Sequence, residues 1–145
     1  MDAGKLEEVI LEGGCYCGEV RYRVDGDVLI KGQCHCRECQ TISGGAPGLF
    51  MGIAQDGFTY IKGQPKTFAR SDLENPVIRE FCADCGTHLT SLRPGGTGWV
   101  ILKIGTLDDP SVFGQAQIAI FTKDKQPFHM IADGIATFEG LPPRE

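Results

Sequence analysis

Apolar residues occur along this chain in short runs, several of which alternate with polar residues. In the clearest run, at 20–24, three apolar residues alternate with two arginines, a pattern typical of a strand with one buried face. Twenty glycines and eight prolines interrupt the chain and leave little room for long helices. Strand-like runs are found at 9–11, 19–24, 49–53, 58–61, 77–81, 88–92, 99–104 and 118–121. The pattern predicts a mainly β, mostly antiparallel fold.

One helical turn is predicted, at 37–42. The 145 residues suffice for one domain with a real core and are too few for two comfortable ones. We therefore expect a single domain over 1–145, with its core at about 9–140. The tail at 133–145 is expected to run off the fold, although its apolar residues Ile135 and Phe138 could dock on the core.

Charge and hydropathy argue against nucleic acid and membranes as partners of this protein. The formal charge is −5, acidic and basic residues are mixed, and no Lys/Arg block occurs, which argues against nucleic acid as a partner. No apolar run approaches the roughly 18 residues of a membrane-spanning helix. The first eight residues are charged and lack the apolar stretch of a signal peptide. We expect a cytoplasmic protein without a membrane partner.

The seven cysteines fall into three tight clusters. They are Cys15 and Cys17, then Cys34, Cys36 and Cys39, then Cys82 and Cys85. An odd number cannot be fully paired as disulfides, and cysteines two residues apart would form a strained ring. Zn²⁺ is the commonest soft cation that such closely spaced thiolates bind. Metal ligation in a reducing compartment is the favoured interpretation.

Seven ligands divide naturally into four and three. Residues i and i+2 of an extended strand point to the same face, so Cys34, Cys36 and Cys39 can converge on one ion from a single short segment. The other two pairs together supply the four sulfurs of a closed structural site. Pairing 34/36 with 82/85 would also give four sulfurs. One zinc with ordinary buried thiols, or an iron–sulfur cluster, is a less favoured alternative.

With these motifs in view, the chain resembles the glutathione-dependent formaldehyde-activating enzyme family, whose domain is shared with centromere protein V. The segments that carry the resemblance lie at 13–22, 34–40, 43–44, 81–87, 105–110, 133–134 and 138–140. The resemblance implies small twisted antiparallel sheets stapled by two zinc ions.

The resemblance also implies a role for each cluster. The first and last cysteine pairs would hold a structural zinc, and Cys34, Cys36 and Cys39 a labile catalytic zinc. The implied activity is that of a carbon–sulfur lyase, which acts on glutathione, formaldehyde and their adduct S-hydroxymethylglutathione.

A mechanism follows as a hypothesis. Three thiolates leave one zinc position open, where a substrate thiol could bind as thiolate and add to an aldehyde carbon. Gln40, Ser43 and Gly44 follow the three cysteines and are candidate donors to a substrate carboxylate.

Other polar residues receive structural interpretations. We expect His35 to point away from the metal and to be hydrogen bonded, His88 to pack in the core, and His129 to lie on the surface. Arg70, Arg79 and Lys103 are candidate anion contacts only because they are cationic, and solvated strand positions are the favoured interpretation.

Two other classes of function stay open. Both metals could stabilise a small β fold that binds a partner without catalysis. Alternatively, the three-cysteine site could act as a zinc or redox sensor. Exposed strand edges make a homodimer reasonable.

Overall fold

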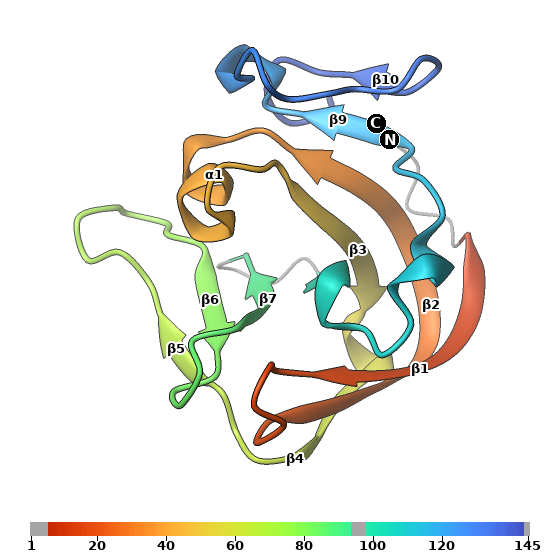
Figure 1. Cartoon of the computed structure of the whole chain (residues 1–145), viewed down its shortest axis with the longest axis vertical. Coiled ribbons are helices and arrows are strands. Elements are labelled where there is room, and N and C mark those ends of the chain that lie inside the picture. The colour runs from red at the N-terminus through yellow and green to blue at the C-terminus, as the bar shows by residue number, and fades with distance from the viewer. Residues whose placement is uncertain (1–5, 94–97, 144–145) are drawn as a thin grey trace.

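The computed structural model describes residues 6–93 and 98–143, which form a strongly curled sheet and a short α-helix (Figure 1). The strands of this part of the chain are β1 (Glu7–Gly14), β2 (Arg21–Cys34), β3 (Gly48–Ala54), β4 (Phe58–Lys62), β5 (Lys66–Phe68), β6 (Ile78–Phe81), β7 (His88–Leu92), β8 (Trp99–Lys103), β9 (Ile118–Ile120) and β10 (Ala136–Thr137). The helix is α1 (Arg37–Ser43), and 3-10 turns lie at η1 (Gln55–Gly57), η2 (Ile104–Thr106), η3 (Pro110–Phe113) and η4 (Thr122–Asp124). Within these ranges, no helix has the length and apolar character needed to cross a bilayer.

β2 is the central strand of the sheet. Its first half pairs with β1 and β4, and its second half pairs with β3 and β9. The sheet continues from β3 through β8, β7 and β6 to β5, and from β9 to β10. The register shifts between Val28 and Ile30, and such an irregularity lets a strand bend. Among these strands only the β2–β9 and β9–β10 pairings are parallel, so the prediction of a mainly antiparallel β fold is confirmed.

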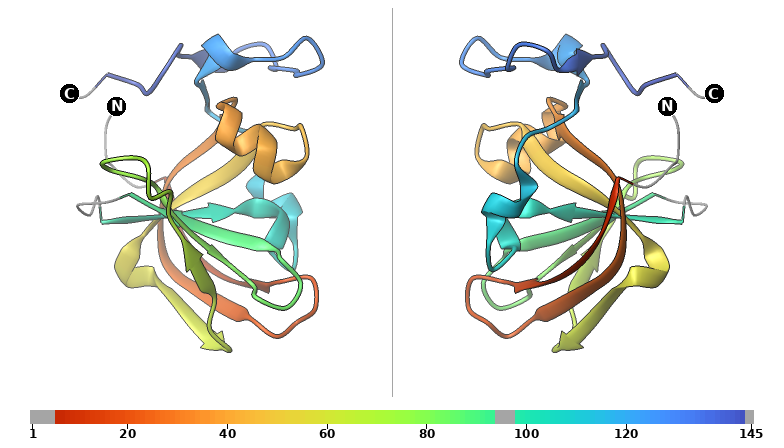
Figure 2. Two further views of the ribbon diagram at one scale, coloured as in Figure 1. Left: turned by 90° about the vertical axis from the view of Figure 1, so that its left-hand side faces the viewer. Right: turned by 90° about the vertical axis from the view of Figure 1, so that its right-hand side faces the viewer.

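The two faces of the curled sheet bury different sets of residues. Tyr22, Val24 and Val28 of β2 are fully buried on the inner face, where they pack with Leu102 of β8. A second apolar cluster, on the other face, contains Ile30, Cys34, Cys39, Phe50, Ile118 and Ile120. Figure 2 shows that the segment from β9 to β10 lies across the end of the sheet where α1 sits. The second face is therefore flanked by α1 and the C-terminal segment.

Most predicted elements agree with the structure. Each predicted apolar run overlaps a strand, and the predicted helical turn lies within α1. The strands join into one continuous sheet rather than several small ones. The sequence pattern missed the second half of β2, because Gly26 between two aspartates is typical of a turn. In the structure a Cβ at Gly26 would lie 3.0 Å from the Cα of Gly57, so this glycine permits a close approach of two backbones instead.

Gly13 occupies a position where the sheet has no room for a side chain. A Cβ there would lie 2.3 Å from the backbone oxygen of Thr106 and 2.4 Å from Oη of Tyr22. Those two residues are themselves hydrogen bonded through their hydroxyl groups at 2.7 Å. Gly13→Ala should therefore lower the free energy of unfolding by about 1–3 kcal/mol, measured by urea denaturation of zinc-saturated protein.

Gly105→Ala is the matched control. A Cβ at Gly105 meets no atom of the described structure within 4 Å beyond its chain neighbours. Its effect should stay within about 0.5 kcal/mol. Equal destabilisation by the two substitutions would contradict the packing argument at Gly13.

Candidate metal centres

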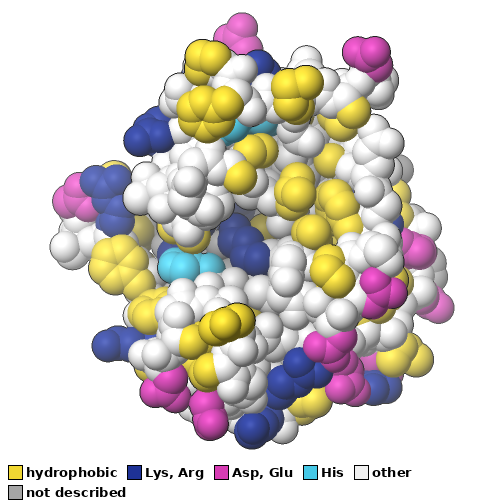
Figure 3. All heavy atoms as spheres, in the orientation of Figure 1, with side chains coloured by type: hydrophobic (Ala, Val, Ile, Leu, Met, Phe, Trp, Pro, Cys, Tyr) yellow, Lys and Arg dark blue, Asp and Glu magenta, His cyan; other side chains and the backbone are white. Residues whose placement is uncertain are grey.

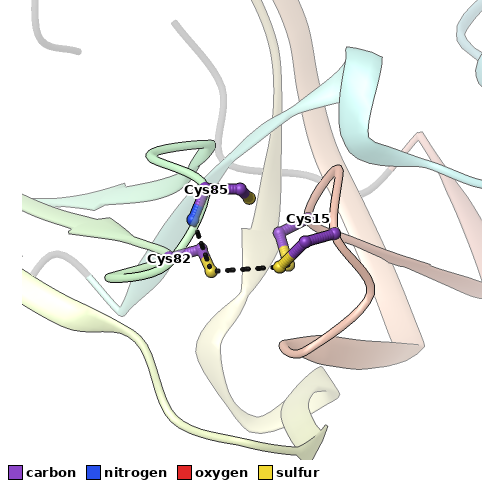
Figure 4. A group of neighbouring side chains, drawn as sticks. Cys15, Cys82 and Cys85 are labelled. Carbon is purple, nitrogen blue, oxygen red and sulfur yellow. Dashed lines mark hydrogen bonds between the residues drawn. The ribbon is translucent and has the colours of Figure 1, made fainter.

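Four cysteines from two distant turns meet in one cluster. Cys15 and Cys17 lie in the turn between β1 and β2, and Cys82 and Cys85 lie in the turn between β6 and β7. Their Sγ atoms all lie within 4.8 Å of one another. Figure 4 shows the side chains of Cys15, Cys82 and Cys85 facing one another across the gap between the two turns. This is the four-sulfur grouping favoured by the sequence.

Backbone groups support this cluster. Val20 donates its N–H to Cys15 Sγ at 3.2 Å, and Cys85 donates its N–H to Cys82 Sγ at 3.5 Å. Gly18 and Gly86 have φ of 82° and 80°, which allows each turn to close behind its cysteine pair. Such N–H donors orient sulfur ligands and stabilise their thiolate form.

The distances within the four-cysteine cluster fit zinc. Tetrahedral coordination with Zn–S bonds of about 2.3 Å places neighbouring sulfurs about 3.8 Å apart. The Cys15–Cys17 and Cys17–Cys82 Sγ separations are 3.6 and 3.7 Å. The four thiols could therefore hold a zinc ion.

Three further cysteines meet at the junction of β2 and α1. Cys34 is the last residue of β2, Cys36 is the N-cap of α1, and Cys39 lies in the first turn of the helix. Their Sγ atoms also lie within 4.8 Å of one another, and Cys39 donates its N–H to Cys36 Sγ at 3.3 Å. Among the residues that the structure describes, no fourth cysteine, histidine or carboxylate group joins this cluster. The donor set suits a metal ion with one position left for another ligand.

Hydrogen bonding within the three-cysteine cluster favours one thiolate. Interactions from the side chains of Cys34 and Cys39 lower the pKa of Cys36, and the positive charge of Arg79 contributes in the same direction. Thiolates are the form in which cysteines bind metal.

The three-cysteine cluster lies in the wall of a cavity of about 530 Å³. The cavity extends over the second apolar face of the sheet, between α1 and the C-terminal segment. Its apolar lining includes Ile30, Phe50, Trp99, Ile101, Ile118, Ile120 and Phe121. Phe121 is the one described non-glycine residue with positive φ, at 54°, and it borders this cavity. A molecule that enters here meets the three thiols.

Six cationic side chains also line this cavity, against two carboxylates. The cations are Arg37, Arg70, Arg79, Arg93, Lys103 and Lys123, and the carboxylates are Glu38 and Asp124. Figure 3 shows Lys/Arg and His side chains meeting inside a hollow with hydrophobic side chains on its border. The chain as a whole carries a formal charge of −5, so this concentration of positive charge is local.

The expectation of solvated positions is wrong for Arg79. Its side chain is 9% exposed, donates to Ser91 Oγ at 3.2 Å and forms an ion pair with Glu38. Lys103 is half-buried, and this burial lowers its pKa. Arg70 is exposed, as expected, and pairs with Asp72 at 2.6 Å.

Gln40, Ser43 and Gly44 have partners within the protein. Gln40 is buried, and its Nε2 donates to the backbone oxygens of His35 and Asp124 at 2.7 and 2.8 Å. Ser43 Oγ donates to the Ala46 oxygen at 2.5 Å, and Gly44 caps α1 with φ of 84°. None of the three lines the cavity. Their polar groups are therefore engaged in holding α1 and the C-terminal segment together.

His35 and His129 form a buried pair. His35 is hydrogen bonded, as expected: its Nε2 lies 2.9 Å from Nε2 of Gln33 and its Nδ1 lies 2.9 Å from Nδ1 of His129. The expectation that His129 lies on the surface is wrong, because the residue is 3% exposed and its Nε2 lies 2.7 Å from the Gly45 oxygen. The pair ties the C-terminal segment to the end of β2.

His88 borders a second cavity, of about 440 Å³. Its ring stacks on Phe81 with the centroids 5.5 Å apart, and within the described residues its Nδ1 has no hydrogen-bond partner. Burial lowers the pKa of His88, and the positive charges of Lys103 and Arg79 add to this effect. The Glu38 and Arg79 side chains line both cavities.

Sequence reasoning missed the cavity as a whole. Its lining combines alternate residues of several strands with residues of α1 and the C-terminal segment. The available signal was the alternation on β8, where Lys103 shares a face with Trp99 and Ile101.

Comparison with known proteins gives a family match, a sequence relative and a solved structure of similar fold. The family described as glutathione-dependent formaldehyde-activating enzyme matches residues 10–124. A Halomonas elongata protein named "Putative glutathione-dependent formaldehyde-activating enzyme" is 33% identical over 92 residues, which are 59% of this chain and 58% of that protein. A crystal structure of a Rhodobacter sphaeroides protein shares the fold, with a TM-score of 0.57 and 17% identity over 73% of this chain and 97% of the other. The family match spans well over half of the sequence, and the chain therefore belongs to the glutathione-dependent formaldehyde-activating enzyme family.

Proposed function

We propose that this protein is a zinc-dependent carbon–sulfur lyase-type enzyme that acts on thiol–aldehyde adducts such as S-hydroxymethylglutathione. The observation that carries the proposal is the three-cysteine cluster in the wall of a cavity, without a fourth protein ligand among the described residues. Family membership supports glutathione and formaldehyde as the substrate class.

The two clusters would have different roles. Cys15, Cys17, Cys82 and Cys85 would hold a structural zinc, and Cys34, Cys36 and Cys39 a catalytic zinc. When bound at the three-cysteine site, zinc supplies a Lewis acid that lowers the pKa of an arriving thiol.

The protein's own residues would position the reactants. Phe50, Trp99 and Ile101 cover the cavity floor with apolar surface, which excludes water and strengthens electrostatic interactions inside. Cationic side chains would attract the acidic groups of the thiol. The addition forms one sulfur–carbon bond, breaks the π bond of the aldehyde carbonyl and transfers the thiol proton to its oxygen. The reverse reaction cleaves the carbon–sulfur bond.

A reducing cytoplasm would suit this chemistry, and all seven cysteines are free thiols. Homodimer formation stays a prediction.

The activity test is an exchange measurement. Zinc-loaded protein should accelerate the interconversion of glutathione and formaldehyde with S-hydroxymethylglutathione above the uncatalysed rate, measured by exchange NMR. Cys39→Ser protein should show only the uncatalysed rate, because it lacks one ligand of the three-sulfur set. If wild-type protein leaves the rate at its uncatalysed value for several different thiols, the proposed enzyme activity is wrong and a non-catalytic zinc module is favoured.

Removing one cysteine from each cluster should have different structural consequences. Cys39→Ser should lose one zinc and keep its fold, because its cluster lies within six residues of one segment. Cys82→Ser should lose the other zinc and unfold, because the binding energy of a structural zinc is folding energy. Metal analysis and circular dichroism measure both effects. Unfolding of Cys39→Ser would contradict the proposed division of roles.

Gly48 provides space for the three-cysteine site. A Cβ at this position would lie 3.2 Å from Sγ of Cys39, tighter than most Cβ contacts, and 3.4 Å from its Cβ, so the cysteine would have to shift by a few tenths of an ångström. Gly48→Ala should shift Cys39 and weaken zinc binding at this site by about tenfold, measured by competition with a chromophoric chelator. Gly105→Ala should bind zinc as wild type does. Unchanged affinity in Gly48→Ala would show that the cluster tolerates the displacement.

A further inference from the structure

Lys103 is a cation within an otherwise apolar stretch of the cavity floor. It lies at the end of β8, on the same face as Trp99 and Ile101, and it pairs in register with Phe50 of β3. Its side chain is half-buried, and burial lowers its pKa. Placing an ammonium group here costs free energy unless an anion compensates it.

The described part of the protein supplies no carboxylate to Lys103. No ion pair within residues 6–93 and 98–143 includes its Nζ. Of the two carboxylates in the cavity lining, Glu38 is paired with Arg79. The positive charge of Arg79 lowers the pKa of Lys103 and so disfavours its charged form. The thiol groups of the three-cysteine cluster, Cys39 foremost, act in the opposite direction.

The cysteines do not remove the need for a further anion. Three thiolates and one divalent cation carry a net charge of −1, whereas six cations and two carboxylates line the same cavity. The cavity as a whole therefore keeps positive charge in a protein that is acidic overall. Lys103 and the three cysteines line the same cavity of about 530 Å³, so a molecule whose anionic group binds the lysine there can also reach the three thiols.

We propose that Lys103 binds the carboxylate of the thiol substrate and so restricts the enzyme to carboxylate-bearing thiols. This inference rests on the proposed function for the identity of the reacting group. The ammonium would hold the acid group on the cavity floor while the sulfur of the same molecule reaches the three-cysteine site. An uncharged thiol would lose this contact and leave the ammonium without its partner.

Binding of an unreactive ligand tests the contact apart from turnover. S-methylglutathione keeps the carboxylates of glutathione and has no free thiol, so isothermal titration measures its binding without thiolate formation, and comparison of Lys103 variants isolates the carboxylate contact. Lys103→Met should weaken its binding by about tenfold to a hundredfold, the usual effect of removing a hydrogen bond to a charged group. Lys103→Arg should keep most of the affinity. Lys66→Met, an exposed substitution on β5 with the same change in charge, should bind as wild type does.

Kinetics provides a second readout. In Lys103→Met the KM for 3-mercaptopropionate should rise about tenfold or more, while kcat stays within about twofold. The KM for uncharged 2-mercaptoethanol should be unchanged. Metal analysis and thermal melting should show two zinc ions and a folded protein.

Several results would overturn the inference. Wild-type affinity for S-methylglutathione in Lys103→Met would do so, as would equal weakening in Lys66→Met or no binding by the wild type. Loss of zinc from Lys103→Met would identify the lysine as a counter-charge of the cysteine cluster instead. If wild-type protein turns over no thiol yet binds S-methylglutathione through Lys103, the proposed function fails and the binding site stands. If turnover is present and Lys103→Met is indistinguishable from wild type, only the inference about Lys103 fails.

Discussion

The pairing of β2 with strands on both of its sides is the constraint on which the rest of the structure depends. The turn that contains Cys15 and Cys17 leads into β2, and Cys34 is its last residue, so the two cysteine clusters lie at opposite ends of this strand. At its end, β2 is held between β3 and β9, where Cys34 pairs in register with Gly48 and Ile120. A ligand at that position cannot move without disturbing three strands. The strand therefore fixes where each metal can bind.

The cysteine clusters could be predicted because the members of each cluster or pair are only two or three residues apart in sequence. Alternation along an extended backbone brings Cys34 and Cys36 to one face, and the first turn of α1 returns Cys39 to the same place. The choice between the two possible four-sulfur pairings could not be made from spacing. It depends on which turns meet in space, and the structure brings the β1–β2 turn to the β6–β7 turn.

The sequence predictions were wrong for residues whose environment is determined by elements distant in sequence. His129 lies in a polar segment with a proline, which favours the surface, yet the segment covers the end of β2 and its imidazole meets His35. A cationic residue on a short strand predicts a solvated side chain, but α1 provides Glu38 as the partner of Arg79. Propensity and local pattern contain no information about such contacts. The cavity is the largest example, because its wall is made by strands, α1 and the C-terminal segment together.

The two clusters differ in what their metal would add to the fold. Cys17 and Cys82 are 65 residues apart in sequence, so a zinc that holds both closes a long loop and removes much conformational freedom from the unfolded chain. Cys34, Cys36 and Cys39 are already placed by β2 and by the N-cap of α1, where Cys36 accepts the backbone N–H of Cys39. A metal at the second cluster closes no long loop. The fold can therefore keep this site intact whether or not it is filled, which is the property that exchange with an external ligand requires.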